Sequence, residues 1–155
     1  SFDMGGTTAK ICLVEDGRPK TASSFEVART YRFKKGSGML VSTPVVEMVE
    51  IGAGGGSIAA RDGMGRLQVG PASAGSEPGP ACYGRGGVAP SVTDANLAMG
   101  KLAPANFAGG SIALHSDLSS AAIARLAMED AAFGITELVD ENMANAARVH
   151  TVENG

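Results

Sequence analysis

Glycine is concentrated in one part of this chain, and that distribution constrains the fold more than any other feature. The 155 residues include 22 glycines, with 12 of them between Gly52 and Gly87 and a single one between Gly110 and Gly155. Glycine permits tight turns and close backbone contacts, and it destabilises helix interiors. Because the glycines follow no strict three-residue period, a collagen-like triple helix is excluded. The sequence predicts a turn-rich first part and a helical last part.

The other helix-breaking and helix-forming residues divide the chain in the same way. No proline follows Pro104, and the last third is rich in Ala, Leu, Met and Glu, which favour helices. We expect one α/β module, α+β within this segment, with a glycine-rich β part over residues 1–93 and a helical part over residues 94–155. The chain opens on Ser1 with a functional-looking loop directly after it. We therefore expect a single incomplete segment of a longer polypeptide.

Composition argues against several kinds of partner. The formal net charge of −3 gives no reason to expect nucleic acid or an anionic membrane. No apolar run reaches the roughly 18 residues of a membrane-spanning helix, and no signal peptide opens the chain. The two cysteines, Cys12 and Cys82, are too few for a disulfide framework or a zinc knuckle. A cytoplasmic protein is the expectation.

Short β-rich runs bounded by turn signals fill the first part. We expect a strand that ends at Asp3 and a strand over residues 10–15 to form a hairpin around the turn 4–7. The other predicted extended segments are 23–35, 45–51, 57–60 and 67–69. The predicted loops are a basic one at 34–38 and an irregular Gly/Pro-rich one at 70–89.

Apolar spacing and capping residues predict three helices in the last part. They cover residues 94–101, residues 118–133 and the residues after 136. The predicted N-caps are Thr93 for the first helix, Ser116 or Asp117 for the second and Thr136 for the third, and the predicted end of the second helix is Gly134.

The first stretch that could carry chemistry is DMGGTT, residues 3–8. Two glycines in a turn let backbone N–H groups approach a phosphate, which Thr7 and Thr8 can also contact, and Asp3 can hold a hydrated Mg²⁺. An ordinary hairpin turn with an Asx-type bond at Asp3 explains the same residues. The spacing is neither a P-loop nor G-x-G-x-x-G, so it supports neither a Walker nor a Rossmann nucleotide site.

The second stretch is the run Gly54, Gly55, Gly56 and Ser57, which follows the predicted strand 45–51. Consecutive ordered glycines cost about 0.5–1 kcal/mol each in conformational entropy. Such a cost indicates that the backbone here comes close to something, either a ligand or the neighbouring loop 70–87. Close packing is the more frequent reason.

The third stretch is the loop 71–87. Its reactive side chains are Glu77, Cys82, Tyr83 and Arg85. Cys82 has no histidine near it in sequence, so a packed structural loop is favoured over a nucleophilic thiolate.

Three polar residues elsewhere in the chain are single candidates for a contact or a ligand role. Asn96 has no capping role and is left as a candidate polar contact. His115 and His150 are unpaired by spacing, and His150 is expected to be a dipole-favoured or core residue. No metal-ligand cluster is visible in the sequence.

Six stretches occur together in one order: DMGGTTAK, EIGAGGGSIA, VGPASAG, PGPACYGRGG, VTDANL and ENMANAARVHTVENG. In this order they resemble the hydantoinase A / 5-oxoprolinase family over nearly the whole chain. They are most similar to the branch that holds N-methylhydantoinase A subunits and acetone and acetophenone carboxylase subunits. In the other branch the first loop reads more like DMGGTSTD, so Lys10 stands here in place of an acid and removes one possible Mg²⁺ ligand.

The resemblance implies part of an actin-like ATPase fold, with ATP and Mg²⁺ bound between two lobes. DMGGTT would be the second of two phosphate loops, and Asp3 would be the catalytic and metal-binding carboxylate. The candidate cofactor-binding residues are Gly5, Gly6, Thr7, Thr8, Lys10, Gly54, Gly55, Gly56 and Ser57. The first phosphate loop and the adenosine-binding motif are expected outside residues 1–155, so this segment is not expected to hold ATP well alone.

The resemblance also implies a reaction. Family members couple ATP hydrolysis to opening a cyclic amide or to carboxylating a ketone. The leading hypothesis is a hydrolase subunit that opens a hydantoin or 5-oxoproline type of ring by phosphoryl activation of its carbonyl. The alternatives are an ATP-dependent ketone carboxylase subunit and, in another class, a non-catalytic scaffold or partner-binding lobe. A companion hydantoinase B-type subunit or domain is the expected partner.

Overall fold

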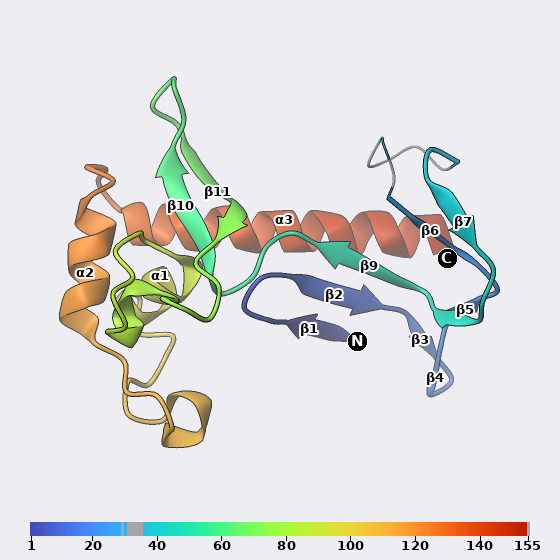
Figure 1. Cartoon of the computed structure of the whole chain (residues 1–155), viewed down its shortest axis with the longest axis horizontal. Coiled ribbons are helices and arrows are strands. Elements are labelled where there is room, and N and C mark those ends of the chain that lie inside the picture. Colours follow the sequence, from blue (N-terminus) through green and yellow to red (C-terminus); the bar gives the residue numbers. More distant parts are fainter. Residues whose placement is uncertain (29, 31–35, 155) are drawn as a thin grey trace.

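Three antiparallel strands form a sheet near the middle of the molecule, in the order β1-β2-β9 (Figure 1). In this computed structural model, which describes residues 1–28, 30 and 36–154, they are β1 (Phe2–Met4), β2 (Ala9–Cys12) and β9 (Met48–Ile51). Along β2 the buried Ala9 and Ile11 alternate with the exposed Lys10, as in a strand with one covered face. The predicted hairpin is confirmed, because β1 pairs with β2 and residues 5–8 form the loop between them.

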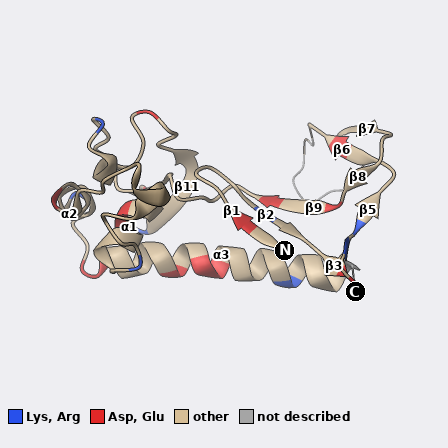
Figure 2. Ribbon diagram, turned by 90° about the horizontal axis from the view of Figure 1, so that it is seen from below, with Lys and Arg blue, Asp and Glu red and all other residues tan. Residues whose placement is uncertain are grey.

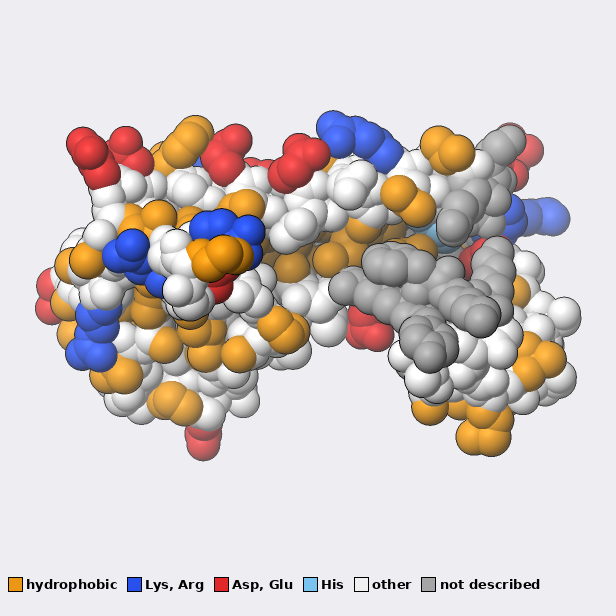
Figure 3. All heavy atoms as spheres, turned by 90° about the horizontal axis from the view of Figure 1, so that it is seen from above, with side chains coloured by type: hydrophobic (Ala, Val, Ile, Leu, Met, Phe, Trp, Pro, Cys, Tyr) orange, Lys and Arg blue, Asp and Glu red, His pale blue; other side chains and the backbone are white. Residues whose placement is uncertain are grey.

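The long helix α3 (Ala131–Asn154) packs along the covered side of this sheet (Figures 1 and 2). Its buried residues Ile135, Val139 and Met143 share the main hydrophobic core with Ile11 and Ile51 of the sheet. Burying a large apolar side chain stabilises a fold by about 1.5–3 kcal/mol. Charged side chains lie along the outward side of α3 (Figure 3), so the helix is amphipathic. No helix among the described residues is long and apolar enough to cross a membrane.

The remaining helices gather beside a β-hairpin near the N-terminal end of α3 (Figure 1). The hairpin consists of β10 (Ser57–Arg61) and β11 (Leu67–Ser73). The helices are η1 (Ala81–Tyr83), α1 (Val92–Ala98), η2 (Phe107–Gly110) and α2 (Ser116–Ala124). A second, smaller core surrounds Cys82, Leu97 and Leu114. It joins η1 and α1 to the segment before α2.

Three two-stranded ladders complete the β part. They are β3 (Val14–Glu15) with β4 (Arg18–Pro19), β5 (Thr21–Ala22) with β8 (Val45–Val46), and β6 (Phe25–Val27) with β7 (Met39–Val41). The predicted strands 10–15 and 45–51 are therefore each divided in two. Of the predicted segments 23–35 and 34–38, residues 29 and 31–35 lie outside the described residues.

The helix predicted over residues 118–133 is present as α2, but its predicted end was wrong. α2 ends at Ala124, and Ala127 and Asp130 adopt φ values of 48° and 50°, which a right-handed helix does not allow. Gly134 does not end a helix but lies inside α3, where a Cβ would come 3.1 Å from Leu67 Cδ2. The absence of a side chain therefore lets β11 approach α3 closely.

The predicted N-caps were also wrong. His115 precedes α2 and makes no side-chain cap, and Thr136 lies inside α3, where its hydroxyl donates to Phe133 O. The N-cap of α1 is Ser91, whose Oγ accepts from the N–H of Asp94, instead of Thr93.

The predicted irregular loop begins later than expected. β11 continues to Ser73, which pairs with Ser57 of β10, and one 3-10 turn follows at η1. The irregular segment therefore starts after residue 73.

Candidate functional site

The loop between β1 and β2 presents backbone N–H groups at its tip. The N–H of Gly5 donates to Thr8 O at 2.9 Å and closes the loop. Across the part of the chain that the structure describes, the N–H groups of Gly6 and Thr7 donate no hydrogen bond, and both residues are exposed. Consecutive free N–H groups in a turn form a concave anion-binding site. This loop can therefore bind a phosphate oxygen without displacing a protein partner.

A second glycine loop, residues 52–56, packs directly on the first. The N–H of Gly55 donates to Gly5 O at 3.0 Å, and the N–H of Gly56 donates to Gly6 O at 2.6 Å. A Cβ on Gly54 would lie 2.7 Å from the backbone of Gly5, Gly6 and Thr7, closer than Cβ contacts occur. Close backbone approach is therefore why glycine is required at position 54.

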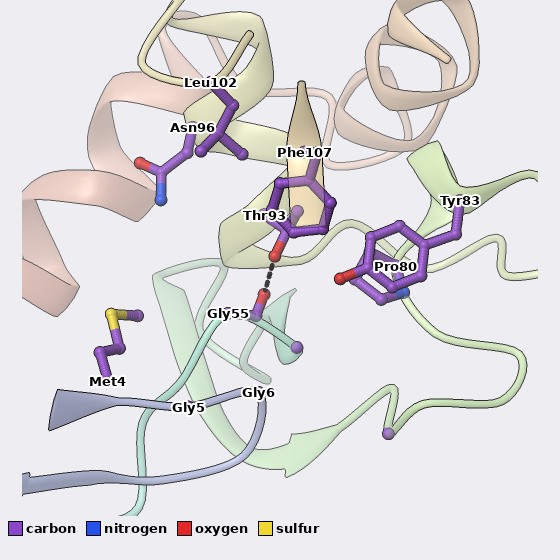
Figure 4. A pocket seen from close by; sticks show the side chains of 12 residues that line it. Met4, Gly5, Gly6, Gly55, Pro80, Tyr83, Thr93, Asn96, Leu102 and Phe107 are labelled. Carbon is purple, nitrogen blue, oxygen red and sulfur yellow. Dashed lines mark hydrogen bonds between the residues drawn. The ribbon is translucent and has the colours of Figure 1, made fainter. Parts of the chain in front are cut away.

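Helix α1 and strand β10 hold the second loop from its other side. The N–H and the hydroxyl of Thr93 both donate to Gly55 O, each at 2.8 Å (Figure 4). The buried Ser57 accepts the N–H of Gly54 on its Oγ at 2.9 Å. These contacts fix the conformation of the loop, since every N–H from Gly54 to Gly56 has a partner within the protein.

Asp94 organises the segment that leads into α1. Its fully buried carboxylate accepts the N–H and the hydroxyl of Ser91 at 2.9 and 2.7 Å, and the N–H of Cys82 at 2.8 Å. The N–H of Ala81 is a further donor at 3.3 Å. Hydrogen bonds to a charged group contribute about 1.5–3 kcal/mol each. Asp94 therefore holds η1, and with it Tyr83, against α1.

These elements enclose a pocket of about 310 Å³ (Figure 4). One wall is the glycine backbone of Gly5, Gly6 and Gly55, and the opposite wall carries the rings of Tyr83 and Phe107, with centroids 5.8 Å apart. The other lining residues are Met4, Gly56, Gly75, Pro80, Thr93, Asn96 and Leu102. Burial raises the pKa of the Tyr83 hydroxyl, so this group remains a proton donor. The volume lies within the range of about 300–1,000 Å³ that is typical of small-molecule sites.

An adjoining pocket of about 410 Å³ shares three residues with the first. The shared residues are Gly6, Gly75 and Tyr83, and the added ones are Thr7, Ser76, Arg85 and Ile112. The tip of the first glycine loop therefore borders both pockets.

The structure brings some of the predicted site residues together and not others. Gly5, Gly6, Gly55 and Gly56 line the first pocket, Thr7 lines the second, and Thr8, Lys10, Gly54 and Ser57 line neither. Asp3 also lies outside both pockets, on the exposed face of the sheet. Its register partner is Lys10, which in turn lies opposite the exposed Glu50. The described residues contain no group of three or more His, Cys, Asp or Glu that could hold a metal ion.

Cys82 and His150 are both buried. Burial raises the pKa of the Cys82 thiol, and the neighbouring Asp94 carboxylate raises it further. A thiol that stays protonated is a poor nucleophile, which agrees with the interpretation of this segment as packed. His150 is buried on α3, as expected for a core residue.

The apolar wall of the pocket was not predicted from the sequence. Pro80, Leu102 and Phe107 come from three separate segments and converge only in the fold. No local pattern marks these residues, because none has a turn, capping or periodic role that singles it out.

Solved structures with this fold define its class. The nucleotide-free structure of an acetone carboxylase, an enzyme described by its ATP-dependent acetone carboxylation, matches with a TM-score of 0.78 at 28% identity, over 96% of this chain and 21% of that one. The ATP-dependent caprolactamase from Pseudomonas jessenii matches with a TM-score of 0.72 at 42% identity, over 95% of this chain and 21% of that one. The chain is a mixed helix-and-strand segment of the actin-like fold, as the resemblance implied.

The sequence comparisons define its family. The model of the hydantoinase/oxoprolinase family matches residues 1–155. The caprolactamase alpha subunit of Pseudomonas jessenii is 43% identical over 100% of this chain and 22% of its own length. The acetophenone carboxylase gamma subunit of Aromatoleum aromaticum is 38% identical over 94% of this chain and 20% of its own length. The chain belongs to the hydantoinase/oxoprolinase family and spans about a fifth of the length of these relatives.

Proposed function

We propose that the full-length protein is an ATP-dependent hydrolase subunit that opens a cyclic amide by phosphoryl transfer to its carbonyl oxygen. The observation that carries this proposal is the pair of free N–H groups at Gly6 and Thr7, held at the edge of a pocket by the second glycine loop. The caprolactamase relative, which is ATP-dependent by its description, supports the choice of a cyclic amide.

In this proposal the first glycine loop binds the transferred phosphate. The N–H groups of Gly6 and Thr7 and the hydroxyls of Thr7 and Thr8 donate to the phosphate oxygens, and Gly5 allows the close approach. Lys10 adds positive charge on the face that it shares with Asp3. Gly55 and Gly56 line the pocket, Gly54 packs against the first loop, and Ser57 holds Gly54.

Asp3 is the proposed Mg²⁺ ligand. Mg²⁺ keeps several waters and takes one or two carboxylates together with substrate phosphates. Asp3 fits this requirement, because it is exposed and lies two residues before the loop. The ion would neutralise the charge that develops on the phosphate oxygens.

The reaction consumes one ATP and two waters. The amide carbonyl oxygen accepts the γ-phosphoryl group, and the bond from phosphorus to the leaving ADP breaks. Water adds to the activated carbon, the C–N bond breaks, and the ring nitrogen takes up the proton. A second water cleaves the resulting acyl phosphate into carboxylate and inorganic phosphate. The protein contributes mainly position and charge stabilisation.

A ketone carboxylase subunit is the second candidate, and its support is the similarity to the acetone and acetophenone carboxylases. Relatives are described as alpha and gamma subunits, which supports a multi-subunit enzyme. We propose a companion subunit or domain of the hydantoinase B type. In a third, non-catalytic candidate, this region only contacts that partner.

The test is phosphate release by the full-length protein with its companion. Hydantoin, 5-oxoproline and caprolactam are compared with acetone and acetophenone supplied with bicarbonate. We expect a cyclic amide to stimulate release, and Asp3→Ala to lower kcat about 100-fold, while the exposed Asp117→Ala on α2 serves as the matched control. Stimulation by ketone and bicarbonate alone would favour the carboxylase. No stimulation by either class, with Asp3→Ala unchanged, would leave the scaffold role.

A further inference from the structure

Asn96 places an unused carboxamide in the pocket. It lies on α1, one turn after Thr93, and its half-buried side chain points toward the side of the pocket where Met4 lies (Figure 4). Its backbone oxygen accepts from Lys101, but its side chain makes no hydrogen bond to any described residue. Its amide atoms are not fully buried, so water reaches them when no ligand is bound. A carboxamide with both its donor and its acceptor free is therefore available to a ligand.

The opposite side of the pocket is suited to the flat, apolar body of a small ring. The rings of Phe107 and Tyr83 lie across the pocket from Asn96 and Met4 (Figure 4), and Leu102 adds aliphatic surface. The two rings are tilted by 46° to each other. A ligand in this pocket would therefore contact an amide on one side and aromatic carbon on the other.

The position of the pocket argues against the base of a nucleotide as its occupant. The aromatic wall and the Gly5–Gly6 loop line the same pocket of about 310 Å³. In ATP, the ribose and two phosphates separate the base from the terminal phosphate. A base in this pocket would lie directly beside a terminal phosphate bound at Gly6 and Thr7, although the ribose and two phosphates separate these groups along ATP. The group beside the terminal phosphate is the one that receives it.

We infer that this pocket binds the phosphoryl acceptor and that Asn96 selects an acceptor with a cis amide, an inference that rests on the proposed function. In a small ring the amide is held cis, so its N–H and C=O point to the same side. The Asn96 carboxamide presents Oδ1 and Nδ2 along one edge, and the two amides form two parallel hydrogen bonds. An open-chain secondary amide is trans. Its N–H and C=O point to opposite sides, and only one of the two bonds can form.

This pairing leaves the carbonyl oxygen free to accept the phosphoryl group. A carbonyl oxygen has two lone pairs, so it accepts from Asn96 Nδ2 with one and faces the phosphate loop with the other. When the oxygen becomes phosphorylated, the ring N–H becomes a stronger donor to Oδ1. Asn96 is therefore a substrate-binding residue, and its contact strengthens as the amide is activated.

The experiment uses the full-length protein with its companion and compares Asn96→Leu with wild type. Asn96→Leu keeps the side-chain shape and removes both hydrogen bonds, Asn96→Asp keeps the acceptor and removes the donor, and Asn142→Leu on the exposed surface of α3 is the matched control. The readouts are KM for caprolactam, KM for ATP, and the ratio of kcat/KM for caprolactam to that for N-methylacetamide. The thermal unfolding midpoint checks that each variant folds.

We expect Asn96→Leu to raise KM for caprolactam about 10- to 100-fold, as the loss of two hydrogen bonds predicts. KM for ATP should stay within about twofold. The preference for the cyclic amide should fall by about 3- to 10-fold, because the cyclic amide loses two hydrogen bonds and the open-chain amide loses one. If Asn96→Leu does not fold, KM for caprolactam is compared between Asn96→Asp and wild type, since the Asp side chain has the same shape as that of Asn. A rise in KM for ATP alone, or a Leu variant equal to the Asn142→Leu control, overturns the inference while the proposed function stands. If no cyclic amide stimulates the wild-type enzyme, the proposed function fails and this inference fails with it.

Discussion

Gly54→Ala tests whether the two glycine loops are held together by close backbone contact. The new Cβ would lie 2.7 Å from Gly5 O, from Gly6 C and from Thr7 N. All three are backbone atoms, so no flexible side chain can move aside. We expect the second loop to move away from the first, and the hydrogen bonds that Gly55 and Gly56 donate to it to lengthen or break.

The magnitude follows from two contributions. Overpacking a well-packed site costs typically about 1–3 kcal/mol. Each of the two hydrogen bonds contributes about 0.5–1.5 kcal/mol. The free energy of opening this region should therefore fall by about 2–6 kcal/mol, and the lower value corresponds to exchange about 30-fold faster at the affected amides.

Amide hydrogen exchange of the Gly55 and Gly56 N–H groups in the full-length protein measures this opening directly. Gly52→Ala is the matched control from the same loop, because a Cβ at Gly52 has no heavy atom within 4 Å. Exchange that is no faster in Gly54→Ala than in Gly52→Ala would refute the reasoning. KM for ATP should rise in Gly54→Ala and stay unchanged in the control, since only the first variant displaces the proposed phosphate loop.

Further predictions concern three single residues. Gly6→Val should fold, because a Cβ at this position meets no heavy atom within 4 Å. It should lower ATP-coupled phosphate release at least about 100-fold, because the new side chain blocks access to the free N–H groups. Full activity of this variant would rule out the phosphate loop. Cys82→Ser should retain most activity, and a complete loss would point to the discounted thiol. Because burial raises the pKa of Cys82, its thiol ionises at mildly alkaline pH only in the unfolded protein. The free energy of unfolding of the wild type should therefore fall more steeply than that of Cys82→Ser as the pH rises above about 8.5. Asp94→Asn should lower the free energy of unfolding by at least about 2 kcal/mol, since an amide nitrogen would face buried donors; an unchanged thermal midpoint would contradict this.

Features set by neighbouring residues could be predicted from the sequence. The β1–β2 hairpin depends on Gly5 and Gly6 and on the alternation of Ala9, Lys10 and Ile11, all within a few positions. The close approach at the glycine run was also predictable, since its entropic cost requires a compensating contact. The predicted contact with the loop 70–87 is present, because the N–H of Ala74 donates to Gly56 O at 2.8 Å. The contact with Gly5 and Gly6 was not predictable, because it joins residues about 50 positions apart in the chain.

Features set by distant contacts could not be predicted. Thr93 has the side chain of an N-cap, but its hydroxyl binds Gly55 O, 38 residues away, and Ser91 takes the capping role. Gly134 has the appearance of a helix end, but it lies inside α3, where Leu67 of β11 packs closely against it. In both cases a tertiary contact overrides a local preference of modest size.

The first turn of α1 connects the two walls of the pocket. Thr93 fixes the glycine wall through Gly55, and Asp94 fixes the aromatic wall through the segment that carries Tyr83. Asn96 projects from the same helix into the pocket, on the side where Met4 lies. The position of a ligand held by Asn96 is therefore set relative to the phosphate loop by helix α1 and by the hydrogen bonds that Thr93 and Asp94 make to the two walls. Because phosphoryl transfer depends on in-line placement of the acceptor, Thr93→Val should lower kcat for a cyclic amide more than it changes KM, as expected for a residue that positions and does not bind.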